Sequence, residues 1–283
     1  MSAPDLRRTP ARPDLAADFL RGQVEAARFV PGVRRRVLEP VAPLKRQPSA
    51  AASLDSEVLF GEIVTVYEET PEGWAWGQLE TDGYVGWIPA DALGPEGEAA
   101  THQVTALATF LYPGPEMKLP PRLVLPFGSR LTLTGTTEKR GLVYGLTSGG
   151  AVVLRHLAPV GTVEPDFVAV AERFVGRPYL WGGRSSVGID CSGLVQAALM
   201  AAGHPAGRDS DMQAAELGTR LPPDTPPMRG DLAFWPGHVG ILLDGDRLLH
   251  ASGYQMSVVV EPFAEAVARI AAGGTALSGL NRL

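Results

Sequence analysis

The chain has 283 residues, a length that favours two or three domains over one. With 45% hydrophobic and 20% charged residues, its composition is that of an ordinary globular protein and excludes the disordered and fibrous classes. No apolar run is long enough to span a bilayer, so no membrane span is expected. The N-terminus lacks the apolar core of a secretory signal, and a single cysteine cannot form an internal disulfide. Together these features predict a cytoplasmic protein.

The formal net charge of −6 is unevenly distributed. Residues 1–48 carry ten Lys and Arg against five Asp and Glu, whereas the remainder carries fifteen against twenty-six. A basic arm can bind nucleic acid or membrane, but this one has apolar residues to bury and no interleaved aromatic residues. We therefore expect the arm to pack on the acidic body, with no nucleic-acid partner. Within it, one amphipathic helix is predicted over residues 13–28, and the prolines that follow predict extended chain.

Short β-branched and aromatic segments begin near Glu57 and are separated by Gly, Pro and Asp turns. The pattern recurs at a constant offset of 67 residues, with Phe60-Gly61 matched by Phe127-Gly128, Leu79 by Leu146, Gly83 by Gly150 and Val85 by Val152. A gapless offset indicates two copies of one unit. We expect two small β barrels, the first over residues 49–97 and a degenerate second over residues 98–160. The segment GWAWGQLETDGYVGWIPADAL resembles bacterial SH3-like domains.

Residues 161–283 predict an α+β domain of ordinary size. Helices are expected at residues 166–175 and from Cys191 to about Gly203. The later segments HVGILL, RLLHASG and SVVVEP predict strands, and an Ala-rich helix follows them.

Cys191 stands in the first turn of its predicted helix. A lone cysteine is more often a small buried apolar residue than a nucleophile. At a helix start, however, unpaired N–H groups and the helix dipole favour a thiolate. Asp190, directly before it, is a plausible N-cap.

Two histidines can meet this cysteine if the strands around Asp244-Gly245-Asp246 form a hairpin with a three-residue loop. His250 then lies opposite Gly240, and His238 lies diagonally next to His250 on the same sheet face. A two-residue loop would place the rings on opposite faces. With Cys191 the pair supplies a nucleophile, a base and a group that orients the base. Zinc binding is the rival use, but the sequence offers no fourth ligand near the three residues.

The segments RPYLWGGRSSVGIDCSGLVQAAL, GHVGI and LLHASG, in this order, resemble the NlpC-type cell-wall peptidases, which have a papain-like fold. With two SH3-like domains in front, the resemblance extends to the YkfC-type architecture. It implies a multidomain protein with an NlpC-type papain-like catalytic domain at residues 161–283. It also implies that Cys191 is the nucleophile, His238 the base and His250 the orienting residue, with no cofactor and no metal.

The resemblance further implies a murein peptide substrate, cut after γ-D-glutamate at the following diamino acid, and a preference for fragments with a free L-Ala. The substrate-binding residues that it implies are Tyr179, Trp181, Asp209, Ser210, Glu62 and Tyr84. Paired carboxylates suit a buried ammonium, and Asp209 with Glu62 would supply them. Three of these residues also have a structural alternative: Asp209 as a helix cap, and Tyr179 and Trp181 as core aromatics.

We therefore predict a cysteine peptidase that acts through a thioester intermediate. Two alternatives stay open at this point. One is a non-enzymatic wall-binding protein that works through its barrels, and the other is an acyltransferase that uses the same cysteine. The sequence does not indicate an oligomeric state.

Overall fold

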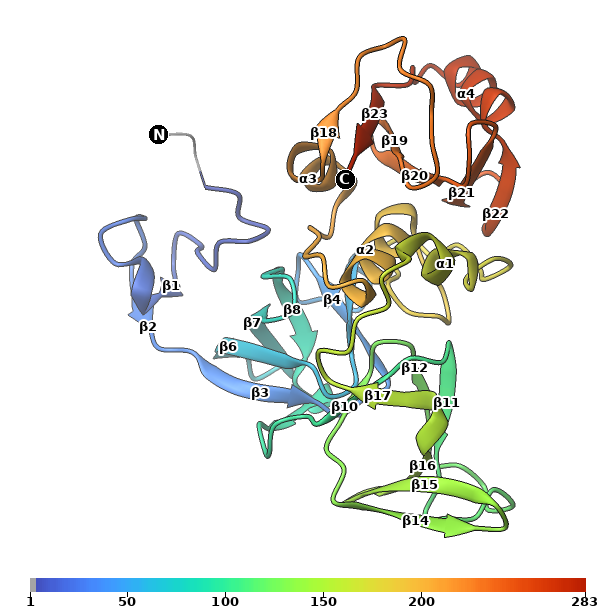
Figure 1. The fold of residues 1–283 in the computed structure, drawn as a ribbon. Coiled ribbons are helices and arrows are strands. Elements are labelled where there is room, and N and C mark those ends of the chain that lie inside the picture. The colour runs from blue at the N-terminus through green and yellow to red at the C-terminus, as the bar shows by residue number, and fades with distance from the viewer. Residues whose placement is uncertain (1–3) are drawn as a thin grey trace. The chain divides into compact units, whose positions relative to one another are not determined.

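The computed structural model describes residues 4–283. The chain divides after Val160 into two compact units, and each is described by itself (Figure 1). None of the helices among the described residues is both long enough and apolar enough to cross a bilayer.

The first described residues, up to Val30, contain no α-helix, so the helix predicted over residues 13–28 is wrong. Instead β1 (Ala16–Ala17) pairs in parallel with β2 (Phe29–Val30), and a 3-10 turn, η1 (Asp18–Leu20), lies between them. Gly22 adopts φ +81° in the middle of the segment, a left-handed conformation that ends a helical run. Phe19, which the helical stripe would have buried, is 58% exposed.

These residues pack onto the first sheet. Leu15 is fully buried in a cluster with Trp76 and Trp87. The Arg12 guanidinium lies 4.3 Å from the centre of the Trp76 ring and 4.9 Å from that of Trp87, a cation–π arrangement. The arm is thus held by apolar burial and by cation–π contacts as well as by charge.

The first sheet has seven strands in the order β5-β4-β8-β7-β6-β3-β9. They are β3 (Val33–Val37), β4 (Val41–Lys45), β5 (Leu54–Leu59), β6 (Ile63–Glu69), β7 (Trp74–Leu79), β8 (Val85–Pro89) and β9 (Leu93–Pro95), with η2 (Ala90–Ala92) before the last. Residues 33–45, which we expected in the arm, therefore form two strands of this sheet. Their apolar residues explain it, because Val37, Ala42 and Leu44 are buried in its core.

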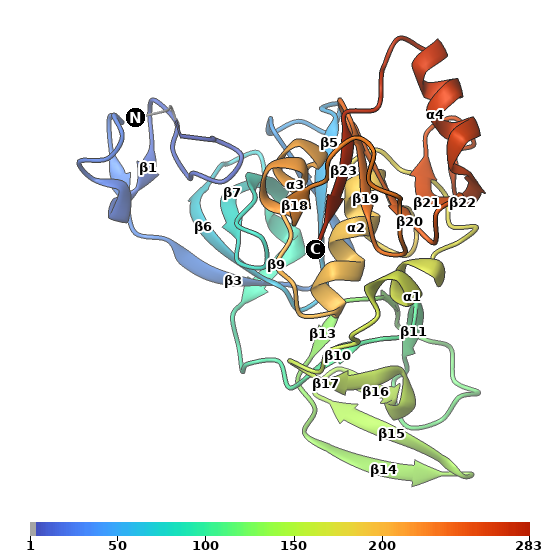
Figure 2. The ribbon, with the colours of Figure 1, turned by 45° about the horizontal axis from the view of Figure 1, so that its top comes forward.

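Three small sheets follow within the same unit, ordered β13-β10-β17, β11-β12 and β14-β15-β16 (Figures 1 and 2). Their strands are β10 (His102–Val104), β11 (Ala108–Leu111), β12 (Leu123–Pro126), β13 (Arg130–Leu131), β14 (Gly135–Lys139), β15 (Leu142–Thr147), β16 (Gly150–Val153) and β17 (Leu157–Pro159), with η3 (Leu154–His156) before the last. A core of Val104, Leu111, Leu125, Leu131 and Val152 lies between them.

Backbone hydrogen bonds recur at the offset of 67 residues seen in the sequence. The matched donors and acceptors are Phe60 N to Pro40 O and Phe127 N to Leu107 O, Gly61 N to Val37 O and Gly128 N to Val104 O, and Glu62 N to Leu59 O and Ser129 N to Pro126 O. The two Phe-Gly turns also meet, because Arg130 donates its N–H to the Phe60 carbonyl at 2.8 Å.

The second unit is built on a six-stranded sheet ordered β18-β23-β19-β20-β21-β22. Its strands are β18 (Thr219–Arg220), β19 (Leu232–Trp235), β20 (His238–Leu242), β21 (Arg247–Ser252), β22 (Ser257–Pro262) and β23 (Gly279–Arg282). Its helices are α1 (Phe167–Glu172), α2 (Cys191–Ala201), α3 (Ser210–Glu216) and α4 (Phe263–Ala272). The helices expected near residue 166 and from Cys191 are thus present, as are the three strands expected after residue 237.

Helix α4 follows β22 directly and packs back on the sheet (Figure 1). Its Ala266 lies in a buried cluster with Trp235, Leu242 and Leu248. In the strand register these three share a face with His238 and His250. Helix α4 therefore covers part of the sheet face that carries both histidines.

The two Phe-Gly turns generate a paired prediction. Gly61 (φ +79°) and Gly128 (φ +85°) both have left-handed backbone, so alanine at either costs about 1–2 kcal/mol. A Cβ at Gly61 would also clash with the Arg130 carbonyl oxygen, whereas one at Gly128 would meet only Leu59 Cδ1, at 3.4 Å. We expect Gly61→Ala to lower the unfolding temperature of the first unit clearly more than Gly128→Ala, measured by calorimetry. Equal losses in unfolding temperature would show that the Arg130 backbone moves away from the new Cβ without an energetic cost.

Candidate functional site

Cys191 is the first residue of α2, and Asp190 is its N-cap. One carboxylate oxygen, Oδ1, accepts the Gly193 N–H at 2.7 Å, and the other, Oδ2, accepts the Gly182 N–H at 3.0 Å. The expected cap is confirmed. It also ties the glycine-rich loop before α2 to the start of the helix, so the backbone on both sides of the cysteine is fixed by one side chain.

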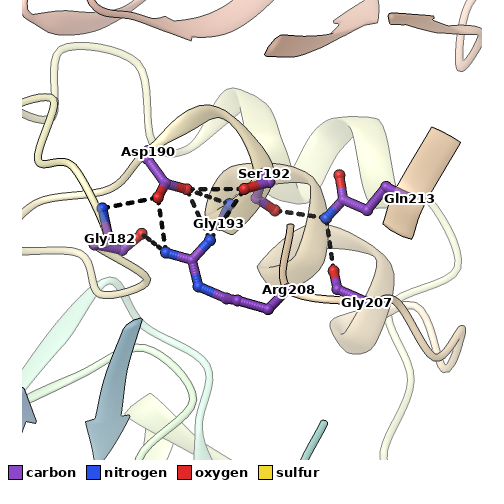
Figure 3. A network of polar contacts seen from close by, with 8 residues as sticks. Gly182, Asp190, Ser192, Gly193, Gly207, Arg208 and Gln213 are labelled. Atoms are coloured by element: carbon purple, nitrogen blue, oxygen red, sulfur yellow. Dashed lines mark hydrogen bonds and ion pairs between the residues drawn. The ribbon is translucent and has the colours of Figure 1, made fainter. Parts of the chain in front are cut away.

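Arg208 completes this arrangement and is 1% exposed (Figure 3). Its guanidinium donates to both Asp190 oxygens, at 3.0 and 2.7 Å, and to the Gly183 carbonyl at 3.2 Å. A bidentate pair of this kind fixes the direction of both groups. Sequence reasoning missed Arg208, because nothing in the polar loop before α3 marks one arginine as buried.

Gln213 of α3 extends the network. Its Nε2 donates to the Ser192 and Gly207 carbonyls, both at 2.8 Å (Figure 3). The segment that carries Asp209 and Ser210 is thereby fastened to the start of α2. Asp209 is the N-cap residue of α3, but its side chain makes no capping hydrogen bond, so the alternative of a simple helix cap is not supported.

The Cys191 sulfur is buried, and its environment differs from the thiolate expected at a helix start. The N–H groups of Val239 and Ser192 donate to it and lower its pKa, and that of Ser192 is the contribution that the helix-start argument requires. Burial outweighs them, with a smaller contribution from the Asp190 charge, and raises the pKa of the thiol to about 12. The bond from Val239, the residue after His238, places the sulfur at the beginning of β20.

The two histidines lie on one sheet face, as the three-residue loop requires. Strands β20 and β21 pair Ile241 with Leu249 and Leu242 with Leu248, a register that sets Gly240 opposite His250. His238 Nε2 and His250 Nδ1 are 2.7 Å apart. Burial, with the neighbouring His250 and Arg269, lowers the pKa of His238 to about 3. His238 is therefore a neutral base, and its Nδ1 is the ring nitrogen that His250 does not engage.

Beyond His250 the polar row continues to Glu261 of β22. His250 Nε2 lies 2.7 Å from Glu261 Oε1, which also accepts from the Arg269 guanidinium. Both ring nitrogens of His250 are thus engaged by protein groups, which leaves no lone pair for a metal. Among residues 4–283 no group of three or more His, Cys, Asp or Glu is arranged to hold a metal ion. Sequence reasoning missed Glu261, although the alternation in SVVVEP places Val259 and Glu261 on one face.

The aromatic candidates of the loop occupy different environments. Tyr179 is partly buried, and burial followed by the Cys191 charge raises its pKa, which places it within electrostatic range of the nucleophile. Trp181 is 65% exposed, which rules out the core alternative for this residue.

Glu62 and Tyr84 belong to the other unit, and both are buried. Glu62 Oε2 accepts the Leu59 N–H at 2.7 Å and so holds the turn at Phe60-Gly61. Tyr84 directly precedes β8. The structure joins His238 to His250, and it places the Cys191 sulfur against the backbone of Val239 with Tyr179 nearby. It also attaches Asp209 and Ser210 to the nucleophile helix through Gln213.

The thiol stands at a helix start and accepts a hydrogen bond from the residue after His238, and His238 in turn contacts a second imidazole. These features are those of cysteine peptidases with a papain-like site. The model of the NlpC/P60 family matches residues 176–270, and the bacterial dipeptidyl-peptidase SH3 domain matches residues 44–93. Residues 176–270 therefore form an NlpC/P60 domain, and an SH3 domain precedes it in the chain.

Relatives support this assignment over most of the chain. A gamma-D-glutamyl-L-lysine dipeptidyl-peptidase of Bacillus subtilis is 29% identical over 76% of this chain and 77% of its own length. Dipeptidyl-peptidase 6 of Lysinibacillus sphaericus is 26% identical over 76% of this chain and 86% of its own. The crystal structure of an NlpC/P60 family protein from Bacillus cereus superposes with a TM-score of 0.71 at 20% identity, covering 88% of this chain and 99% of that one. It shows the same fold.

The buried Asp190–Arg208 pair generates a stability prediction. Removing one partner of a buried ion pair leaves the other charge buried and typically costs about 3–5 kcal/mol. We expect Arg208→Met to lower the free energy of unfolding of the second unit by that amount. Arg229→Met is the matched control, because its ion pairs with Asp166 and Glu172 are largely exposed and are worth under about 1 kcal/mol. An Arg208→Met protein as stable as the control would contradict the prediction.

The thiol environment generates a pH prediction. A pKa raised to about 12 leaves little thiolate at neutral pH, and the thiolate is the nucleophile. The rate of Cys191 alkylation by iodoacetamide should therefore rise about tenfold per pH unit between pH 7 and 10. Because Cys191 is the single cysteine, mass spectrometry of the whole protein follows it without ambiguity. A rate that is flat below pH 8 would instead reveal a preformed thiolate–imidazolium pair.

Proposed function

We propose that this enzyme hydrolyses the bond between γ-D-glutamate and the following diamino acid in murein peptides that carry a free N-terminal L-Ala, and so acts on released fragments during cell-wall recycling. The Cys191–His238–His250 arrangement supports the reaction class. The substrate follows from relatives named gamma-D-glutamyl-L-lysine dipeptidyl-peptidase and Dipeptidyl-peptidase 6, which match three quarters of the chain. A dipeptidyl-peptidase removes two residues from a free N-terminus, which is the end that L-Ala occupies in such a fragment.

The chemistry begins with proton transfer from the Cys191 thiol to Nδ1 of His238. The thiolate attacks the γ-carbonyl carbon of the glutamate, and the carbonyl oxygen takes up the negative charge. We assign the stabilisation of this oxyanion to the backbone N–H of Cys191, because Asp190 already holds that of Gly193. His238 then returns the proton to the leaving amine, and a thioester remains. Water, deprotonated by His238, attacks the thioester and releases the dipeptide and the thiol.

The high thiol pKa and the low imidazole pKa suit this sequence of steps. At neutral pH the Cys191 thiol and the His238 imidazole are both uncharged before substrate binds. Burial of the site therefore does not remove a charge from water. Charge separation then occurs only when substrate is in place. The cost of forming the ion pair becomes part of the activation barrier, and the oxyanion contacts offset it.

We also propose that both halves of the first unit are SH3-like barrels. The first half matches a known SH3 domain over residues 44–93. The second half is supported by the backbone hydrogen bonds that recur at the same offset around the two Phe-Gly turns.

For recognition of the free end we propose that Asp209 holds the L-Ala ammonium, with Ser210 beside it and with Tyr179 and Trp181 along the peptide. Asp209 is supported by its place on a loop fastened to the nucleophile helix and by a side chain that does not cap α3. The exposure of Trp181 suits a residue that stacks on a ligand.

The test compares free and N-acetylated L-Ala-γ-D-Glu-diamino acid peptides. Wild type should release L-Ala-γ-D-Glu, identified by mass, and should strongly prefer the free amine. A charge-assisted hydrogen bond is worth about 1.5–3 kcal/mol, so Asp209→Asn should lower kcat/KM on the free peptide by about ten- to a hundred-fold. The variant should lose little on the acetylated peptide.

Two controls accompany this comparison. Cys191→Ser should show no turnover while keeping its fold, since an alcohol beside this imidazole is a much poorer nucleophile. Asp211→Asn changes the same charge in the first turn of α3 and should leave the preference for the free amine intact. Equal wild-type activity on both peptides would refute the recognition of a free N-terminus, and turnover by Cys191→Ser would refute the assigned nucleophile.

A further inference from the structure

The polar row behind the nucleophile is longer than a catalytic triad. His238, His250 and Glu261 stand on three adjacent strands, β20, β21 and β22. Gly240 and Val259 are the residues opposite His250, and His238 and Glu261 are each displaced by two positions from them. All three side chains therefore lie on one sheet face in a diagonal line. Spacings of 2.7 Å join His238 to His250 and His250 to Glu261.

The far end of the row is anchored. Glu261 Oε1 accepts from Arg269 of α4, and Oε2 accepts from the Gln255 amide at 3.4 Å. The Tyr254 ring lies 4.8 Å from the Arg269 guanidinium and covers it. These contacts fix the position of the carboxylate, and the arginine compensates its charge in a site that is largely shielded from water.

The carboxylate determines where the ring protons are. An ionised carboxylate only accepts hydrogen bonds, so His250 must present N–H at Nε2. A neutral imidazole has one N–H, so His250 Nδ1 carries a lone pair and accepts from Nε2–H of His238. His238 Nδ1 is then left with a lone pair, which is the state needed to take a proton from Cys191. In the opposite tautomer of His250 the proton is on Nδ1. The lone pair on Nε2 would then face Glu261 Oε1, and two hydrogen-bond acceptors would lie against each other.

We propose that Glu261 is a positioning residue that sets the tautomers of both histidines, with Arg269 holding its carboxylate in place. It touches neither the thiol nor the substrate and acts through His250. It also stabilises the imidazolium that forms on His238, because its negative charge acts on that ring through the hydrogen bonds of His250. This inference deepens the proposed peptidase function and rests on it for its kinetic test alone.

The first measurement needs no substrate. Long-range ¹H–¹⁵N correlation spectra of the wild-type protein report which ring nitrogen carries the proton, and His238→Gln and His250→Gln variants assign the two signals. We expect both rings of the wild type to be protonated at Nε2. A proton on Nδ1 of either ring would overturn the proposal, whether or not any variant folds.

The second measurement is Glu261→Gln. An amide can accept at one atom or donate at the other, so it no longer excludes the opposite tautomer. We expect kcat to fall about ten- to a hundred-fold with little change in KM, which is less than the 10²–10⁴ that a general base contributes. Glu265→Gln, an exposed position on α4 with the same change of charge, is the control and should match wild type.

A pH profile separates positioning from simple damage. The groups around the two rings are Cys191 of α2, Glu261 of β22 and Arg269 of α4. Burial lowers the pKa of His250, and Glu261 is the group that opposes this shift. Its loss removes a stabiliser of the imidazolium, so the acid limb of kcat should move to lower pH in Glu261→Gln. If Glu261→Gln has the kcat of the wild type and an unchanged acid limb, the role of Glu261 is refuted. Absence of murein peptide hydrolysis by a wild type with the expected tautomers would refute the proposed function alone.

Discussion

The buried pair between Asp190 and Arg208 is the constraint on which the site depends. One carboxylate caps α2, holds the glycine-rich loop and meets the guanidinium, while the guanidinium also reaches the loop carbonyl at Gly183. Desolvating both charges is costly, and such a pair is weak evidence for added stability. Its value here is geometric, because a bidentate contact fixes the direction in which α2 starts. The position of the Cys191 sulfur follows from that direction.

A second row of polar groups approaches the sulfur from the sheet. This row runs from Arg269 through Glu261 and His250 to His238. Strand register sets the positions of its histidines and of Glu261, whereas a helix cap sets the geometry of the Asp190–Arg208 network. The two networks meet at the thiol, which receives the Val239 N–H from the strand side and the Ser192 N–H from the helix side. Nucleophile and base are therefore each preorganised by separate elements.

The parts of this site that follow local rules could be predicted from the sequence. The helix start at Cys191, its Asp190 cap and the shared face of His238 and His250 each depend on a few neighbouring residues and on the parity of one loop. Arg208 and Glu261 escaped prediction because their roles depend on partners that only the tertiary fold supplies, Asp190 for one and His250 for the other. The helix predicted over residues 13–28 of the arm is wrong for a related reason. Its apolar spacing suits a helix, yet Gly22 interrupts it and Leu15 is buried against Trp76 and Trp87.

The repeated hydrogen bonds around the two Phe-Gly turns have a consequence for how the first unit folds. Adjacent segments that share one backbone pattern are prone to exchange strands during folding, a common cause of misassembly in tandem domains. Here the second half has diverged in sequence and is divided into three small sheets, whereas the first half forms one sheet of seven strands. A strand of one half is thus a poor substitute for its counterpart in the other. The contact between the Arg130 N–H and the Phe60 carbonyl requires both turns, so it joins the two halves at the feature that they share.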